Sequence, residues 1–579
     1  MRWFSKETFY YVKEEIPQGK MDRYRCLDAT TKCILKKANN RILVVMFFLC
    51  VAFAFMFGKL FYLTIMNYQP RSFKPSVLKT ELDISRQDIL DRNGTVIAIN
   101  LKTTDLSVNP KKIKQPEETA QALIRALPDL SYDEVYQKLT SNSNFKYIKR
   151  NLTPIERNAI NWIGNPYLQE TKVEKRVYPQ GHLFSHILGA TDIDTYGIAG
   201  LEKAYNDSLK VDTVQLSLDI SVQDMVREAL QKGIEKYKAT GGLGIVMDVN
   251  TGEVLASVSL PDYNPNMPAE GDTSVRFNKA TLGTYEFGSV FKLFNTAMAL
   301  ENKDIKVTDT FDVSEPIKVG RKLIEDTRGA ERVITVPEVL IHSSNIGSVL
   351  IAQKSGFQKQ KEFLGRFGFY EKLPVDLPEL GITQYPVAEK WADITSANVA
   401  FGYGISITPL HLIAGVSALV NGGNYRVPTF LKNGNQGQPV YRVLDPKISE
   451  QMRRMMWAVI NWDMKETDPV YGYAVGGKTG SANLIVNGKY VQGSLRTSFV
   501  GVFPMDNPKY IVLVTLEDPK KIKETWMFNY AGWNAKPVGL EIISKIAPYL
   551  GVEPKEPWEQ PSYIEKSIQA SLEAKKKNR

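Results

Sequence analysis

Cysteine is scarce in this chain, and its distribution excludes several kinds of site. The three cysteines, Cys26, Cys33 and Cys50, all lie before residue 51 of a chain of 579 residues. Everything downstream therefore has no thiol for a disulfide or a thiolate metal site. Cys26 and Cys33 have no histidine nearby and make a poor zinc site, so we expect unpaired thiols.

Histidine is equally scarce, with four residues in the chain. His182 and His186 have the spacing of two zinc ligands on a helix, but Leu183 occupies the place where a metalloprotease would carry its catalytic glutamate. We expect both histidines to be structural. The same scarcity disfavours a hydrolase built on serine, histidine and aspartate, and we expect neither a metal nor a cofactor.

The net charge of +10 is not spread evenly along the chain. Much of the excess lies at the two ends, between Arg2 and Arg41 and in residues 575–579 (KKKNR), whereas the middle is close to balanced. A nucleic-acid enzyme more often carries a basic stripe across its folded body, so we expect no nucleic-acid partner. Hydrophobic residues at 43% and charged residues at 23% are typical of a folded protein, and the length favours two or more domains.

A long apolar segment lies near the N-terminus. Ile42 to Gly58 is uninterruptedly apolar or small, and Leu60 to Met66 continues it, close to the ~20 residues that a membrane-spanning helix needs. A core helix would show polar positions, and the preceding segment is too long for the charged start of a signal peptide. We therefore predict a single transmembrane signal anchor at residues 42–66.

The charges that flank this segment predict its orientation. Four basic residues lie between Lys32 and Arg41, whereas residues 67–73 contain only Arg71. The positive-inside rule places residues 1–41 in the cytoplasm and everything after about residue 67 outside the membrane. No ATP is available on that side, so the chemistry must proceed without it.

The outer part of the chain divides into regions with different residue patterns. Residues 67–215 alternate short polar helices with turns and include the strand-like run from Ile89 to Ile99, broken by Asn93-Gly94, which is a strong hairpin signal. We interpret this region as a non-catalytic pedestal domain. Residues 216–553 form a second domain. Residues 554–579 are charged with sparse apolar positions, which predicts a solvated or disordered tail.

The second domain is predicted to be an antiparallel sheet with helices packed on it, which is an α+β fold. The predicted elements are a strand at 213–220, an amphipathic helix at 221–237, strands at 244–249 and 253–259 joined by the turn Asn250-Thr251-Gly252, β-rich runs at 497–503 and 510–516, and a closing helix at 537–550.

The strongest candidate for chemistry is Ser289-Val290-Phe291-Lys292. A hydroxyl and an amine three residues apart share one face of a helix, within hydrogen-bonding reach. Gly288 allows a tight approach to the serine, and the apolar neighbours predict a partly buried site. Burial would lower the pKa of the lysine, so that a neutral Lys292 could take the proton of Ser289.

Two further motifs offer groups that would complete such a site. Ser343-Ser344-Asn345 places a hydroxyl and an amide on a predicted loop before a helix, and Lys478-Thr479-Gly480 occurs once in the chain. A cation and a hydroxyl beside an exposed strand edge suit a peptide carboxylate, and glycine lets a substrate lie against the backbone. Residues 472–479 (GYAVGGKT) also match a nucleotide-binding loop, but the polar residues before them and the strand-like run after them disfavour that interpretation.

These three motifs, in this order and at these spacings, resemble the active site of penicillin-binding proteins. Residues 85–94 (SRQDILDRNG), 176–189 (RVYPQGHLFSHILG) and 197–202 (GIAGLE) resemble the pedestal of class B members, and residues 401–412 (FGYGISITPLHL) resemble a segment of their transpeptidase domain. The resemblance implies a multi-domain α+β fold with one N-terminal transmembrane helix, a β-rich or mixed pedestal domain and a serine β-lactamase/transpeptidase-like domain.

Within class B, residues 247–266 (MDVNTGEVLASVSLPDYNPN), 342–348 (HSSNIGS) and 531–538 (AGWNAKPV) most resemble the FtsI-type transpeptidases of the division septum. Three positions depart from the family pattern. Phe287 stands in place of a proline, Gln87 in place of a pedestal glycine, and Ser481 in place of the threonine after K-T-G. None removes a catalytic group, although Phe287 could alter the entrance to the site.

The resemblance implies a serine-type peptidoglycan D,D-transpeptidase that cross-links stem peptides ending in D-Ala-D-Ala during septal cell-wall synthesis, and that β-lactams inhibit covalently. The implied roles are Ser289 as nucleophile, Lys292 as base, Ser343 as proton relay, Asn345 as positioner, Lys478 as electrostatic support, and Thr479, Gly480 and Ser481 as the substrate-binding strand. The backbone N–H groups of Ser289 and Ser481 would form the oxyanion hole.

Other functions stay open at this point. An elongation-type class B transpeptidase resembles the septal one, and a D,D-carboxypeptidase or β-lactamase shares the acylation chemistry. The motifs do not state whether water or an amine resolves the acyl-enzyme. An inert β-lactam receptor is disfavoured because every motif residue is present.

The resemblance also implies partners and a location. We expect no glycan-polymerising domain before the pedestal, so a membrane glycosyltransferase of the FtsW type and other division proteins are implied as partners. The implied location is the bacterial inner membrane at the division septum, with the catalytic domain periplasmic.

Overall fold

The computed structural model describes residues 44–59 and 85–577, apart from 268–271, 328–329, 389–390, 467, 469, 487 and 556–557. The chain divides into two compact units, Met1–Asp83 and Ile84–Arg579. Of the predicted anchor, residues 44–59 are helical with exposed side chains. The rest of the 42–66 span lies outside the described residues, as do Cys26 and Cys33. In the part of the chain that is described, no helix is long and apolar enough to cross a membrane.

The pedestal begins with a hairpin, which confirms the prediction from Asn93-Gly94. Strand β1 (Ile89–Leu90) pairs antiparallel with β2 (Val96–Val108). The Asp91 carboxylate holds the turn between them, because its Oδ1 accepts hydrogen bonds from the backbone N–H groups of Asn93 and Thr95. β1 also runs parallel to β7 (Val214–Gln215), so the first and last strands of the pedestal lie together.

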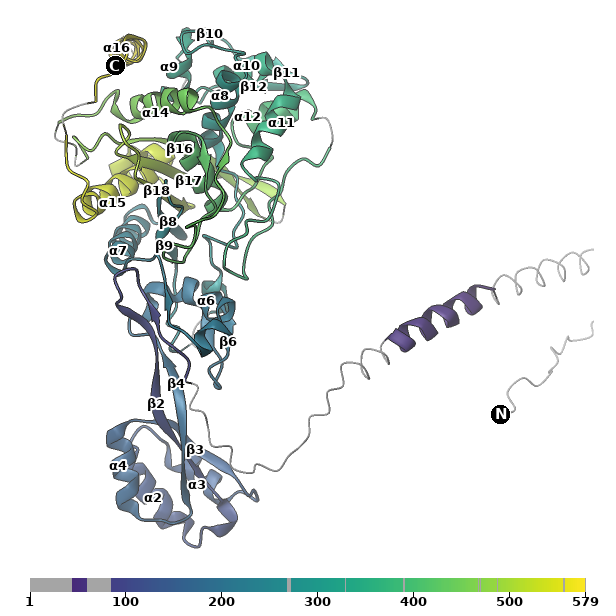
Figure 1. Cartoon of the computed structure of the whole chain (residues 1–579), viewed down its shortest axis with the longest axis vertical. Helices are drawn as coiled ribbons and strands as arrows, with labels where there is room; N and C mark the ends of the chain where they lie inside the picture. The colour runs from purple at the N-terminus through teal and green to yellow at the C-terminus, as the bar shows by residue number, and fades with distance from the viewer. Residues whose placement is uncertain are drawn as a thin grey trace, which may run out of the picture. The chain divides into compact units, whose positions relative to one another are not determined.

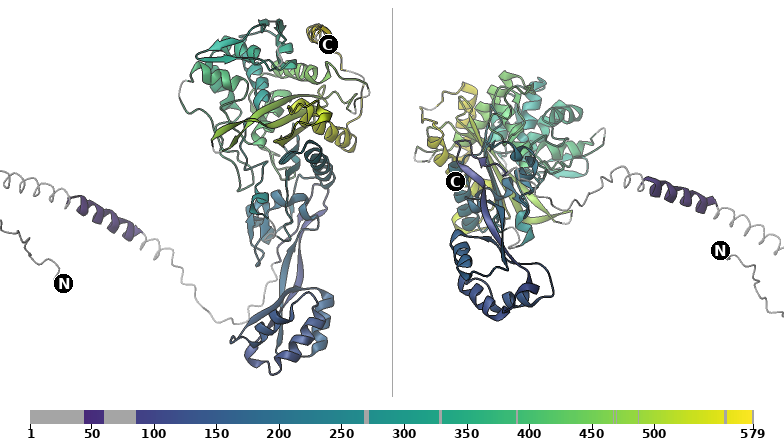
Figure 2. Two further views of the ribbon diagram at one scale, coloured as in Figure 1. Left: turned by 180° about the vertical axis from the view of Figure 1, so that it is seen from behind. Right: turned by 60° about the horizontal axis from the view of Figure 1, so that its bottom comes forward.

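Strand β2 is the central strand of the pedestal's five-stranded sheet. It pairs with β3 (Lys146–Leu152) and with β4 (Leu168–Val177), and Figures 1 and 2 show β2 and β4 side by side as a long ribbon. The helices α2 (Pro116–Ala126), α3 (Tyr132–Thr140) and α4 (Pro154–Ile163) pack around β3 and the far end of β2, and enclose a small hydrophobic core.

A buried ion cluster lies in the pedestal. Glu202 is fully buried, and its two carboxylate oxygens each accept a hydrogen bond of 2.7 Å, one from Arg86 Nε and one from Arg176 Nε. Gln87, the departure from the family glycine, joins this cluster through its backbone. Its N–H donates to the carbonyl of Leu209, and its own carbonyl accepts from Arg176.

The second domain is built on a five-stranded antiparallel sheet in the order β16-β17-β18-β8-β9. Its strands are β8 (Gly241–Asp248), β9 (Val254–Leu260), β16 (Gly476–Val486), β17 (Lys489–Phe503) and β18 (Tyr510–Glu517). The predicted hairpin and the two predicted β-rich runs are confirmed. Gly252 has a φ of +77° in the turn between β8 and β9, a conformation that glycine adopts without strain. Strand β16 carries the K-T-G motif at the edge of the sheet.

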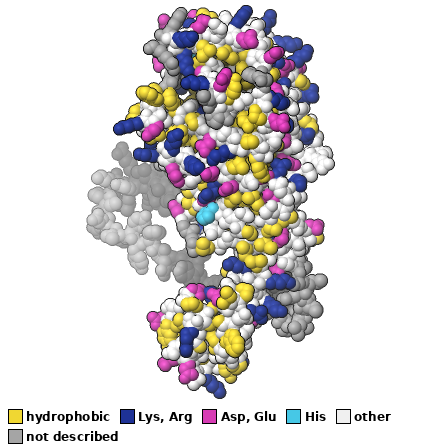
Figure 3. Space-filling model, turned by 90° about the vertical axis from the view of Figure 1, so that its left-hand side faces the viewer, with side chains coloured by type: hydrophobic (Ala, Val, Ile, Leu, Met, Phe, Trp, Pro, Cys, Tyr) yellow, Lys and Arg dark blue, Asp and Glu magenta, His cyan; other side chains and the backbone are white. Residues whose placement is uncertain are grey.

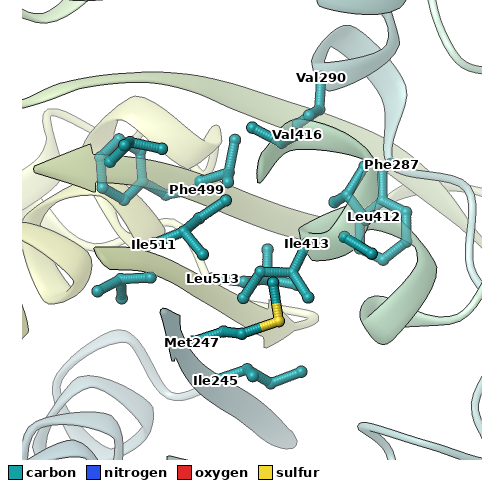
Figure 4. Close-up of a cluster of buried hydrophobic side chains, with 14 of the residues drawn as sticks. Ile245, Met247, Phe287, Val290, Leu412, Ile413, Val416, Phe499, Ile511 and Leu513 are labelled. Carbon is teal, nitrogen blue, oxygen red and sulfur yellow. The ribbon is translucent and has the colours of Figure 1, made fainter. Parts of the chain in front are cut away.

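Helices cover both faces of this sheet. On one face α7 (Ile220–Tyr237) packs against α15 (Ala535–Tyr549), and on the other α13 (Pro409–Val420) packs against α14 (Pro446–Asn461). Figure 4 shows the core beneath α13. There Ile245 and Met247 of β8 stand opposite Leu513 and Ile511 of β18. These side chains are fully buried, so the sheet is fixed on this face by apolar contacts.

The remaining elements are short or lie beside the sheet. They are α5 (Ser185–Leu188), β5 (Ala190–Thr191), β6 (Gly197–Ala199), α6 (Gly200–Ala204), α8 (Lys292–Glu301), β10 (Thr310–Asp312), β11 (Ile317–Val319), β12 (Lys322–Ile324), β13 (Val333–Thr335), α9 (Val336–Ile341), α10 (Asn345–Ser355), α11 (Phe357–Arg366), α12 (Asp393–Ala400), β14 (Asn424–Tyr425), β15 (Tyr441–Arg442) and α16 (Ser562–Lys577).

Two sequence predictions are wrong. Only residues 214–215 of the strand predicted at 213–220 form a strand. The backbone N–H groups of Ser217 and Asp219 donate to the carbonyl oxygens of Phe430 and Leu255 and not to β1, and α7 begins at Ile220, where Asp219 caps it. The charged tail is also not simply solvated or disordered. Its residues from Ser562 form helix α16, which packs on α9 and α14 with Ile564 fully buried.

The surface carries charges of both signs. On the face seen in Figure 3, lysine and arginine side chains are interspersed with aspartate and glutamate. The excess of positive charge therefore does not form one continuous basic patch on that face.

Candidate active site

The first motif lies where a tight turn enters a helix. Residues Gly288–Phe291 form a 3-10 turn, and α8 begins at Lys292. In a 3-10 turn, residues three apart eclipse one another, so Ser289 and Lys292 share a face, as the spacing predicts. The Lys292 side chain is fully buried, whereas Ser289 is partly exposed.

The second motif lies between two helices. Helix α9 ends at Ile341 with His342 as its C-cap residue, and Ser344 caps α10 by accepting a 2.9 Å hydrogen bond from the N–H of Gly347. Ser343 connects the two with a φ of +58°. A residue with a side chain adopts this left-handed conformation only where the surrounding contacts impose it.

The third motif runs along the edge strand β16 and touches the nucleophile turn. A Cβ atom at Gly480 would lie 2.1 Å from the carbonyl oxygen of Phe287, and one at Gly288 would lie 2.6 Å from the carbonyl oxygen of Ser481. The backbones of the two motifs therefore approach more closely than side chains would permit. Thr479 is half-buried on the same strand, next to Lys478.

The three motifs meet at Ser343. Lys292 Nζ donates to the carbonyl oxygen of Ser343 at 2.5 Å and to Asn345 Oδ1 at 2.7 Å, and it lies 3.4 Å from Ser343 Oγ. Lys478 Nζ donates to Ser343 Oγ at 2.9 Å and to the carbonyl oxygen of Thr479 at 3.1 Å. The hydroxyl of Ser343 thus stands between two amines that are far apart in the sequence.

Both amines have a lowered pKa in the folded chain. Burial, and secondarily the nearby positive charge of Lys478, lowers the pKa of Lys292 far below its usual value, although Asp326 opposes this shift. Burial, with a smaller contribution from Lys536, lowers the pKa of Lys478 to about 7. A neutral Lys292 keeps a lone pair with which it can accept a proton.

The hydroxyl of Ser289 stays available. Within the described residues its side chain makes no hydrogen bond and is partly exposed, and the turn that carries it packs against β16. Catalytic hydrogen bonds are often long in unliganded sites and tighten when substrate binds. The arrangement can therefore deliver a serine nucleophile, a neutral base and a relay hydroxyl to one substrate, which is the chemistry of acyl transfer.

Two family models match the chain. The penicillin-binding protein dimerisation domain matches residues 82–215, and the penicillin binding protein transpeptidase domain matches residues 242–544. The chain belongs to the penicillin-binding protein transpeptidase family. Both matched domains together make it a class B penicillin-binding protein, and its relatives identify it as most like FtsI.

The curated relatives match over most of their length. A probable peptidoglycan D,D-transpeptidase FtsI of Caulobacter vibrioides is 34% identical over 81% of this chain and 82% of the relative. The peptidoglycan D,D-transpeptidase FtsI of Escherichia coli is 25% identical over 87% of this chain and 91% of that relative. A solved peptidoglycan synthetase from Bifidobacterium adolescentis has the same fold, with a TM-score of 0.64, 22% identity and coverage of 82% of this chain and 97% of that one.

One residue of this penicillin-binding protein's site escapes sequence reasoning. Asp326 follows β12, and its carboxylate accepts hydrogen bonds from the hydroxyl of Ser344 at 2.6 Å, from the N–H of Ile346 at 3.0 Å and from the N–H of Asn345. It therefore fixes the loop of the second motif and the start of α10. An isolated aspartate in a loop gives no sequence signal for this role.

Two departures from the family pattern lie near the site, and both fit their surroundings. Phe287 is 1% exposed and lies edge-on to Tyr285 with ring centroids 6.2 Å apart, so its side chain packs into the interior and does not line the entrance to the site. Figure 4 shows it beside Leu412. Ser481 Oγ accepts a 3.0 Å hydrogen bond from the N–H of Ala531, which ties β16 to the segment before α15.

The rival motifs do not form sites. The nucleotide-loop pattern ends in strand β16, whereas a phosphate loop opens a helix. His186 Nε2 lies 2.7 Å from the carbonyl oxygen of Val275, and His182 faces Asp262 at 3.5 Å. In the described part of the chain, no group of histidine, cysteine or acidic residues is arranged to hold a metal ion.

Proposed function

We propose that this chain is a peptidoglycan D,D-transpeptidase in which Ser289 forms an acyl-enzyme with the penultimate D-alanine of a donor stem peptide. The observation that carries the proposal is the position of the Ser343 hydroxyl, 2.9 Å from Lys478 Nζ and 3.4 Å from Lys292 Nζ. This arrangement provides a path for a proton between a base and a leaving group beside one nucleophile.

Acylation then proceeds as a proton-balanced exchange. Ser289 Oγ attacks the carbonyl between the two D-alanines, and its proton passes to neutral Lys292. The carbon–nitrogen bond breaks, and the leaving D-alanine amine takes a proton through Ser343. Asn345 holds Lys292 in place through its 2.7 Å hydrogen bond. An amine of a neighbouring stem peptide then attacks the ester and completes the cross-link without ATP.

Substrate binding follows from the edge strand. Lys478 supports the site electrostatically, and Thr479 holds the terminal carboxylate. Gly480 leaves the backbone open to an extended peptide lying along β16. The backbone N–H groups of Ser289 and Ser481 bind the developing oxyanion, an interaction whose loss typically costs ~10²–10³ in rate.

The resemblance to FtsI supports a cellular role and location for this activity. The chain acts in septal cell-wall synthesis, anchored in the inner membrane by one helix at residues 42–66, with its catalytic domain periplasmic. A glycosyltransferase of the FtsW type and other division proteins work beside it, because the two matched domains include none that polymerises glycan. β-Lactams acylate Ser289 as covalent inhibitors.

The nucleophile is tested by labelling the full-length chain with a fluorescent penicillin. The wild-type chain is expected to label covalently, and Ser289→Ala to lose labelling entirely, because the variant lacks the hydroxyl that the proposed mechanism acylates. Ser143→Ala serves as the control, since Ser143 and Lys146 have the same spacing in the exposed part of the pedestal. Persistent labelling of the Ser289 variant would place the nucleophile elsewhere.

Product analysis separates transpeptidation from hydrolysis. Donor and acceptor stem peptides are expected to give a cross-linked dimer, whereas a D,D-carboxypeptidase would release the shortened donor alone. Depletion of the protein in its cell is expected to give filaments. Rounded cells would favour the elongation role instead.

A further inference from the structure

The C-terminal residues pack against the catalytic domain. We call the described residues between 552 and 577 the C-terminal strap. Lys555 donates its backbone N–H to the carbonyl oxygen of Gly472 at 2.9 Å, just before β16 begins. The guanidinium of Arg454 on α14 then lies 4.6 Å from the ring centroid of Trp558 and donates to the carbonyl oxygen of Glu559 at 3.0 Å. The strap is thus attached to the loop before β16 and to α14 before it reaches α16.

Helix α16 presents one face to the domain. Ile564, Ser567 and Ser571 recur at helical spacing, and all three are at most 2% exposed. Ser567 Oγ lies 2.9 Å from Thr335 Oγ1 at the start of α9. Figure 1 shows α16 at the same end of the domain as α9. The strap therefore ends against the helix that leads into the second motif.

Helix α16 also contacts His342. The hydroxyl of Ser571 donates its one proton to the carbonyl oxygen of Ser567 at 2.8 Å, so His342 Nε2–H is the donor in the 3.2 Å hydrogen bond to Ser571 Oγ. The ring of Trp462 lies edge-on to His342 with centroids 6.0 Å apart, and Lys575 Nζ is 4.8 Å from the centroid of Trp462. These contacts fix the imidazole ring.

His342 is bonded directly to Ser343, which makes its position matter for the reaction. Ser343 has a left-handed backbone conformation that must be imposed by its neighbours. On one side Asp326 holds Ser344 and Asn345. On the other side the strap holds His342. The residue that carries the hydroxyl between the two lysines is therefore held on both sides, by Asp326 and by the strap.

We propose that the C-terminal strap is a positioning element for acylation, which holds the Ser343 hydroxyl between Lys292 and Lys478 through the hydrogen bond from His342 to Ser571. This inference rests on the proposed function. Ser571 and His342 are positioning residues, because neither contacts the reacting atoms. Losing such an oriented hydrogen bond is expected to slow acylation at saturating ligand by about three- to tenfold, with little change in the affinity that precedes it.

The test is a double-mutant cycle in the full-length chain. The rate of acylation by a fluorescent penicillin is measured against concentration for wild type, Ser571→Ala, His342→Leu and the double variant, at a temperature well below thermal unfolding. His342→Gln keeps an N–H donor at the Nε2 position and is expected to retain most of the rate. Gln569→Ala, at an exposed position of α16, is the matched control and is expected to match wild type.

The outcomes separate the two proposals. Equal losses in the two single variants, with no further loss in the double variant, support the link. Additive losses, or a Ser571→Ala variant that is acylated as fast as wild type, overturn it. If the wild-type chain is not acylated at all, the proposed function is wrong and this inference falls with it.

Discussion

The pedestal and the active site each contain a cluster of buried ionisable side chains, and the two clusters are built in opposite ways. In the pedestal, Glu202 is matched by two arginines at hydrogen-bonding distance. In the active site, Lys292 and Lys478 are both at most 1% exposed, and within the described residues neither forms an ion pair. Their hydrogen-bond partners are neutral oxygens of the motif residues.

This difference distinguishes a cluster that stabilises the fold from a pair of amines that can transfer protons. A buried charge whose partner compensates the lost hydration keeps its charge and orders the chain around it. A buried amine without a carboxylate partner loses its proton more easily, because desolvation disfavours the charged form. Strongly shifted groups of this kind are typical of catalytic sites. The pedestal cluster therefore holds a fold together, and the lysine pair is available for proton transfer.

The largest expected effect comes from removing the base. Lys292→Met keeps the length and burial of the side chain but deletes the amine, so the acylation rate is expected to fall by ~10²–10⁴. The stability of the domain should change by less than about 2 kcal/mol, because losing two hydrogen bonds is offset by no longer burying an amine. Stopped-flow labelling with a fluorescent penicillin and urea unfolding measure the two quantities. Normal acylation by this variant would show that another group is the base.

Breaking the pedestal cluster is expected to lower stability strongly and to leave the acylation rate unchanged. Glu202→Gln leaves Arg86 and Arg176 buried without a counter-charge, which is expected to cost about 3–5 kcal/mol of stability. The acylation rate of the folded protein should be unchanged. Glu134→Gln is the control, because its pair with Lys138 lies on an exposed helix face and is worth at most about 0.5 kcal/mol. Equal urea midpoints for the two variants would contradict the comparison.

A smaller effect is expected in the pH dependence of stability. The pKa of Lys478 is about 7 in the folded chain and about 10.4 in an unfolded one. Between these values the unfolded state binds the extra proton, so stability should rise with pH by up to about 1.4 kcal/mol per unit. Lys478→Met should lack this contribution, so the stability difference between wild type and variant should change with pH by this slope. A stability difference that is flat between pH 7 and 10 would mean that Lys478 stays charged when folded.

The features that were predicted correctly depend on neighbours in the sequence. The hairpin at Asn93-Gly94, the turn at Gly252 and the helix from Ile220 to Tyr237 are set by local turn and capping chemistry. The spacing of Ser289 and Lys292 is likewise local. These signals need no knowledge of the rest of the fold.

The features that were missed depend on partners far away in the chain. The C-terminal tail has a sparse apolar pattern, and only its contacts with Thr335, His342 and Trp462 give it a buried face. Asp326 takes its role from the loop of Ser344, which the sequence does not place beside it. Isolated polar residues carry no periodicity from which such contacts could be read.

The sequence by itself determined which chemical groups are present, their order, and hence the family, because motif identity and spacing are properties of the chain alone. Only the tertiary structure decided that the Ser343 hydroxyl stands between two buried amines that follow and precede it in the chain. Burial and distance set a lysine's protonation, and both arise from packing among segments that the sequence keeps apart.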